Sequence, residues 1–285
     1  MTLCIAADCD FEGQPAVVLC CDWRAQTGSV NSALIGADDV YKIRQRGAAT
    51  VLLAGNPTSA DELLTGCKGA IEEFTRKGTG VDSDLAMNEF LEGLRKAAAL
   101  KKIELIRHLV PMRMGMTFDD FKELPPNDHI EVWGEIRDLT LGADLIIGCV
   151  MDEPIVVTLD RWGHAAWHAN YAAIGEGSDV ARAMLCLQPW EGHGSYDLMG
   201  PLTSVSLPHC LYRVYEAKRA AHIAHPSSVG EATQFEILLS QSRRHGISTR
   251  GLELLENVFL KKHGRVPEVE MDKTVLTEAQ LFPLR

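Results

Sequence analysis

Four short apolar runs occupy most of the first 55 positions of the chain. They are residues 2–9, 15–22, 40–46 and 50–55. The first two runs flank a Gly-containing connection, and the second two follow a loop rich in Gly, Ser and Asn, so each pair predicts an antiparallel hairpin. The second run contains five consecutive apolar residues, which predicts a strand buried on both faces.

A helical spacing of apolar positions follows these runs. It predicts one helix that begins at 56–59 and a second that opens at Ser83 or Asp84 and continues to about Leu109. Residues 111–138 show a less regular pattern, which predicts no defined element there. The remaining pattern predicts strands at 143–151, 155–160, 165–168 and 235–240, and helices at 178–187, 205–224 and 251–262. Strand pairs and helix pairs in this order indicate the α+β class, because a nucleotide-binding sheet would show βαβ alternation.

The composition is that of a globular protein. The chain has 285 residues, of which 46% are hydrophobic and 24% are charged. No repeat or low-complexity tract divides it, so we expect a single domain over 1–285, with an insertion at about 100–140 and a C-terminal extension after about 240. No apolar run approaches the ~18 residues of a membrane span, so we expect no membrane partner.

Charge and cysteine usage narrow the expected partners further. The 28 basic and 39 acidic residues give a net charge of −11, which would repel a phosphate backbone, so we expect no nucleic-acid partner. The eight cysteines form no C-x-x-C pair, and no signal peptide precedes the first predicted strand. We therefore expect reduced thiols and a cytoplasmic protein.

Thr2 is the first candidate for chemistry. A threonine hydroxyl is a weak nucleophile and needs a neighbouring base. When threonine is the first residue of a chain, its own α-amine can be that base, since this amine titrates near ~7.7–8.0. Because an initiator Met is generally removed before a small residue, loss of Met1 would give Thr2 this amine.

Six sequence blocks extend this pattern along the chain. In order they are 2–6, 17–28, 39–43, 51–55, 171–178 and 225–230. Together they resemble the proteasome β-subunits and the bacterial HslV and Anbu peptidases, which are N-terminal nucleophile hydrolases. The resemblance implies a four-layer αββα sandwich with two antiparallel sheets.

The resemblance also implies catalytic roles. These are Thr2 as the nucleophile, Asp22 and Lys42 as an ion pair beside it, Gly55 as the source of an oxyanion-hole N–H, and Ser178 and Ser228 as further catalytic positions. The chemistry is sound, because a nearby cation favours deprotonation of a hydroxyl and a carboxylate holds that cation in place. A backbone N–H aimed at the oxyanion contributes ~2.7–4 kcal/mol to lowering the barrier.

The same resemblance implies substrate contacts, and it shows one position at which this sequence differs from the family pattern. Gln26 and Thr27 would pair with a peptide backbone, and Leu53 would line the first specificity pocket, which predicts a preference for apolar side chains. His225 stands where the family usually has Asp, and a histidine lacks a fixed negative charge near neutral pH. Part of the supporting network must therefore differ from that of the family.

The expected partners are a peptide or unfolded polypeptide substrate and further copies of the same chain in a homo-oligomer, for which the resemblance implies a ring. An ATPase partner cannot be read from one chain. We expect no cofactor, since 175–177 lacks the remaining glycines of a phosphate loop. We also expect no metal, because His164 and His168 would share a face only on a helix, and we interpret both as structural.

Other interpretations stay open. Without the resemblance, Asp22 could simply end a strand and Lys42 could be solvated. The basic positions Arg213, Lys218 and Arg219 are best read as a solvated helix face. Two other functions use the same fold: a catalytically silent ring or scaffold subunit, and an amidase that acts on a small molecule.

Overall fold

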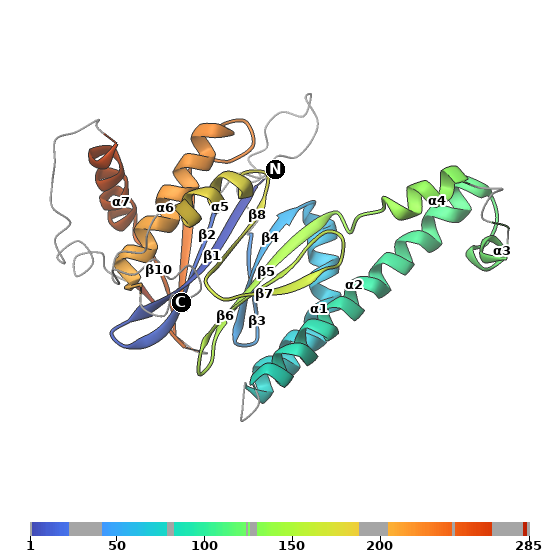
Figure 1. Cartoon of the computed structure of the whole chain (residues 1–285), viewed down its shortest axis with the longest axis horizontal. Coiled ribbons are helices and arrows are strands. Elements are labelled where there is room, and N and C mark those ends of the chain that lie inside the picture. The colour runs from blue at the N-terminus through green and yellow to red at the C-terminus, as the bar shows by residue number, and fades with distance from the viewer. Residues whose placement is uncertain are drawn as a thin grey trace.

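The computed structural model describes residues 2–22, 42–78, 83–123, 125, 130–187, 205–240, 243–263 and 282–283. The predicted α+β class is confirmed: two antiparallel sheets form a sandwich that carries helices (Figure 1). One sheet has six strands in the order β11-β10-β9-β2-β1-β8, and the other has five in the order β3-β4-β5-β6-β7. The N-terminal hairpin is therefore central in its sheet, between strands from the second half of the chain.

The strands are short, and their bounds are as follows. The six-stranded sheet contains β1 (Leu3–Phe11), β2 (Gln14–Asp22), β8 (Tyr171–Gly175), β9 (Thr233–Leu238), β10 (Arg244–Gly246) and β11 (Phe282–Pro283). The five-stranded sheet contains β3 (Ile43–Arg46), β4 (Ala49–Gly55), β5 (Ala143–Val150), β6 (Pro154–Leu159) and β7 (Ala165–His168).

The helices lie between the strand groups in sequence. They are α1 (Pro57–Lys77), α2 (Ser83–Met114), α3 (Phe118–Lys122), α4 (Ile130–Arg137), α5 (Ser178–Leu187), α6 (Leu207–Ala224) and α7 (Thr249–Lys262). The start of α1 has a local cause: the side chain of Asn56 accepts a hydrogen bond from the Ser59 N–H at 3.1 Å, and Pro57 occupies the first turn. In the part of the chain described above, no helix is long and apolar enough to cross a membrane.

Successive side chains of each strand point to opposite faces of its sheet, and this alternation creates three hydrophobic cores. Leu3, Ile5 and Ala7 of β1 pack with α5 and α6 on the outer face of their sheet, whereas Cys4 and Ala6 point at the second sheet. The outer face of the five-stranded sheet packs against α1 and α2 in the same manner. The inter-sheet core thus holds the two sheets together, and the outer cores attach helices to each.

One segment differs from its prediction. The chain is helical across much of 111–138, because α2 continues through Pro111 to Met114 and is followed by α3 and α4. Figure 1 shows this part extending away from the sandwich. Val110, Phe121 and Val132 form a small core of their own there, so the apolar positions follow contacts among three helices rather than one helical stripe.

Candidate functional site

The predicted site lies where several strands end at one edge of the sandwich. β1 begins at Leu3, which pairs with Gly175 at the end of β8, and β2 ends at Asp22, which pairs with Thr233 of β9. Because β1 and β2 are antiparallel neighbours, the residue before β1 must lie beside the end of β2. Thr2 and Asp22 are brought together in this way.

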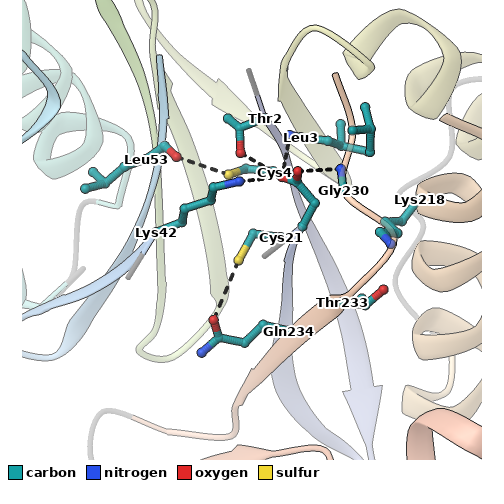
Figure 2. Close-up of polar contacts among 12 residues, drawn as sticks. Thr2, Leu3, Cys4, Cys21, Lys42, Leu53, Lys218, Gly230, Thr233 and Gln234 are labelled. Carbon is teal, nitrogen blue, oxygen red and sulfur yellow. Dashed lines mark hydrogen bonds and ion pairs between the residues drawn. The ribbon is translucent and has the colours of Figure 1, made fainter. Parts of the chain in front are cut away.

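Asp22 lies at the centre of the site and accepts hydrogen bonds from four groups. Its Oδ1 accepts hydrogen bonds from Thr2 Oγ1 at 2.7 Å, from the Leu3 N–H at 2.8 Å and from Lys42 Nζ at 2.8 Å (Figure 2). Its Oδ2 accepts from the Gly230 N–H at 2.8 Å. The exposed fractions of Thr2, Asp22 and Lys42 are 4%, 0% and 7%, so the group is almost fully removed from solvent.

This burial explains why the partners are so close. A buried carboxylate or ammonium is costly unless it is paired and hydrogen-bonded, and Asp22 meets both conditions with Lys42 and its other donors. Thr2 Oγ1 and Lys42 Nζ share one acceptor oxygen, so they lie within about 5–6 Å of each other. A charge at that range changes the protonation of a neighbouring group. The arrangement can therefore act on the Thr2 hydroxyl.

The backbone of Thr2 is fixed from the other side. Its carbonyl accepts a hydrogen bond from the Glu176 N–H at 3.0 Å. Gly175 has φ +95°, and a Cβ there would lie 1.9 Å from the Thr2 carbonyl oxygen. Only glycine fits this position, because both its left-handed backbone and the close approach exclude a side chain.

Leu53 links the second sheet to the site. Its N–H donates to the Lys42 carbonyl at 2.9 Å, and its carbonyl accepts a weak hydrogen bond from the Cys4 thiol at 3.4 Å. The Leu53 side chain points the other way, into the core that α1 covers. β4 ends two residues later at Gly55, whose φ is +107°; a Cβ there would meet the Gly142 carbonyl oxygen at 2.5 Å. The glycine is thus required by its neighbouring strand.

The two predicted serines lie on adjoining loops. Ser178 begins α5 and is half-buried, whereas Ser228 is buried and its N–H donates to the carbonyl of His225, the residue that ends α6. The loops touch through Gly177, where a Cβ would lie 2.8 Å from the Val229 side chain. Neither serine hydroxyl bonds to Thr2 in the described structure. Gln26 and Thr27 lie outside the described residues.

The prediction that Lys218 belongs to a solvated helix face is wrong. Its side chain is fully buried, and its Nζ donates to the carbonyl of Glu231, next to Gly230. Burial lowers the pKa of Lys218 to about 8, with attraction to Asp22 partly opposing that shift. Sequence reasoning missed this residue because a lysine in a helix is ordinarily solvated.

Three cysteines surround the site without offering a second nucleophile. Cys4, Cys20 and Cys21 are all buried, and burial raises the pKa of each thiol, to about 12 for Cys21. A thiol with so high a pKa carries almost no thiolate near neutral pH. None of these three thiols is therefore activated as a nucleophile in the described part of the chain.

Comparison with known proteins supports the fold. No protein-family model matches the chain, and no curated protein does. The solved structure of the Anbu (Gly-1) mutant from Hyphomicrobium sp. strain MC1 matches 95% of this chain and 100% of its own, with a TM-score of 0.51 and 14% identity. The chain shares the fold of Anbu. The resemblance to Anbu seen in the sequence is thereby confirmed at the level of the fold.

Proposed function

We propose that the chain is a threonine-type peptidase or amide hydrolase that uses Thr2 as an N-terminal nucleophile after removal of Met1. The observation that carries this proposal is the buried contact of Thr2 Oγ1 with Asp22 Oδ1, which also binds Lys42 Nζ. The fold shared with Anbu adds support. Its sheets and helices would form the four-layer arrangement of an N-terminal nucleophile hydrolase. Gly55, Ser178 and Ser228 keep their proposed catalytic roles.

The proposed reaction has two halves. The Thr2 α-amine takes the proton of the Thr2 hydroxyl as its oxygen attacks the substrate carbonyl, and the Gly55 N–H stabilises the oxyanion. The amine then passes the proton to the leaving nitrogen, which leaves an ester on Thr2. Water hydrolyses that ester in the second half, with the same amine as its base. Lys42 favours the deprotonated oxygen through its charge, and Asp22 holds Lys42 in place.

The proposed substrate is a peptide or an unfolded polypeptide. Leu53, which lies in the core under α1 with 7% of its surface exposed, would favour an apolar side chain through that exposed part. Gln26 and Thr27 would pair with the substrate backbone. We also propose a homo-oligomer in the cytoplasm, with a ring as the arrangement that the sequence resemblance implies. Enclosure of the nucleophile in such an assembly would limit cleavage to polypeptides that can enter.

The test begins at the amino terminus. Intact-mass analysis of protein from the native source should show loss of Met1, since an attached residue turns the Thr2 amine into an amide that cannot act as the base. A threonine-directed β-lactone should then add to Thr2. Thr2→Ala should abolish both hydrolysis and labelling, and Thr2→Ser should retain hydrolysis because it keeps the hydroxyl.

Lys42→Ala supplies the second arm. It should reduce turnover severely, because the charge beside the hydroxyl is lost. Lys68→Ala is the matched control, since Lys68 is an exposed lysine of α1 whose pairing with Glu72 is at the surface. Retained Met1 together with no effect of Thr2→Ala would refute the proposal and favour a silent scaffold subunit. Hydrolysis of small amides but not of peptides would favour the amidase.

A further inference from the structure

Two titratable side chains of α6 bind the loop that follows this helix. His222 Nδ1 lies 2.7 Å from the Val229 carbonyl oxygen, and Lys218 Nζ donates to the Glu231 carbonyl. The two residues are four positions apart, so they project from the same face of the helix. A carbonyl oxygen can only accept, and the Nδ1 of His222 must therefore carry a proton.

The two bonded carbonyls, of Val229 and Glu231, lie on either side of Gly230, whose N–H reaches the site. The carbonyl of Val229 and the N–H of Gly230 belong to one planar peptide group, so fixing one end orients the other. That N–H is the donor to Asp22 Oδ2 at 2.8 Å. A chain of hydrogen bonds therefore runs from His222 through this peptide group to Asp22. Bonds in such a chain polarise one another, which strengthens the N–H as a donor.

Lys218 fixes the Glu231 carbonyl, two residues beyond that of Val229. Figure 2 shows Lys42 and Lys218 on opposite sides of the site, one near each sheet. The groups that face the Lys218 amine are Cys20 and Asp22 from β2, Glu231 from the loop and Arg219 from α6. Burial of an amine among these groups costs free energy, so its presence is not explained by fold stability alone.

We propose that Lys218 and His222 are positioning residues. His222 holds the peptide group between Val229 and Gly230, and Lys218 holds the loop at Glu231, so that the Gly230 N–H donates to Asp22. They thereby fix the carboxylate that binds Thr2 and Lys42. The effect on turnover rests on the proposed function, whereas the effect on the Gly230 amide does not. The two effects can be measured separately.

The first measurement is hydrogen–deuterium exchange of the full chain, followed in peptides that span 226–234. His222→Leu and Lys218→Met each remove a donor and should speed exchange in this segment by about tenfold, because a hydrogen bond contributes on the order of tenfold to a local equilibrium. His222→Asn should restore slow exchange, since its amide N–H can replace Nδ1. Tyr215→Phe is the control, because it removes a buried α6 hydrogen bond that goes to Glu256 instead.

The second measurement separates positioning from stability. Lys218→Met should leave the melting temperature unchanged or raise it, because it removes a buried amine, yet it should lower kcat about tenfold with little change in KM. His222→Leu should also lower kcat, and His222→Asn should recover it. A merely structural role predicts instead that kcat follows the melting temperature.

The outcomes distinguish the two proposals. Exchange that stays as slow in His222→Leu and Lys218→Met as in Tyr215→Phe would overturn the positioning role, even if the wild-type chain hydrolyses peptides. Faster exchange in both variants of a chain that shows no hydrolysis would support the positioning of Gly230 and refute the hydrolase. Faster exchange with lower kcat and rescue by His222→Asn would support both.

Discussion

Asp22→Asn tests directly the carboxylate at the centre of the site. The substitution keeps the shape of the side chain but replaces two acceptor oxygens with one acceptor and one donor. In the native chain, Oδ1 accepts from Thr2, Leu3 and Lys42, and Oδ2 accepts from Gly230. Either orientation of the amide must therefore point its NH₂ at a donor. The variant also removes the negative charge beside the Lys42 ammonium.

The magnitude follows from this geometry. Removal of one partner of a buried ion pair costs ~3–5 kcal/mol, and Asp22 and Lys42 are both buried. We expect the free energy of unfolding to fall by that amount in urea titrations at pH 7. The dependence of this free energy on urea concentration should stay unchanged. Lys42→Met in the same chain should recover roughly 2 kcal/mol, because contacting residues are coupled and the amine is then gone.

The outcome can contradict the reasoning in two ways. A loss below about 1 kcal/mol in the single variant would mean that the carboxylate charge contributes little to the fold. Losses that simply add in the double variant would mean that Asp22 and Lys42 are not energetically coupled. Both variants should lack hydrolysis. The unfolding data test the ion pair, and the activity data test its proposed role in catalysis.

Two further predictions concern single positions. Gly175→Ala should lower the free energy of unfolding by more than ~3 kcal/mol and abolish Thr2 labelling, because its Cβ would lie 1.9 Å from the Thr2 carbonyl oxygen. Gly13→Ala, whose Cβ meets nothing within 4 Å, should cost only ~1–2 kcal/mol from its left-handed backbone. Burial raises the pKa of Asp8 from 3.8 to about 7, so between these pH values the folded chain binds a proton that the unfolded chain has lost, and stability falls as pH rises from about 4 to about 7. Asp8→Asn should therefore be more stable than the parent at pH 8, by up to about 4 kcal/mol, and show no such gain at pH 4; an equal effect at both pH values would refute this assignment.

The sequence predicts most of the strands and helices of the sandwich. β1, β2 and β5 are continuous apolar runs, and such runs are read reliably because both their faces are buried. β10 is absent from the predicted set, since a strand of three residues carries too little pattern. The helical part beyond Pro111 was also missed, because its apolar positions serve a separate small core.

The candidate site also has residues that the sequence predicts and residues that it does not. Thr2, Asp22 and Lys42 could be predicted to meet, because each lies at the end or start of a strand and the resemblance aligns them. The contribution of Gly230 is a backbone N–H, which has no signature in a sequence. The burial of Lys218 depends on which loop folds over α6, and helical spacing alone does not specify that loop.

The central place of the N-terminal hairpin has a consequence for synthesis on the ribosome. β1 and β2 are made first, but their outer neighbours are β8 and β9, which end at residues 175 and 238. Until those strands have left the exit tunnel, both edges of the hairpin lack partners and Asp22 lacks the Gly230 amide. The nucleophile and its carboxylate are thus translated early and assembled late. Closure of the site must wait for contacts between segments about 200 residues apart, which are slow to form.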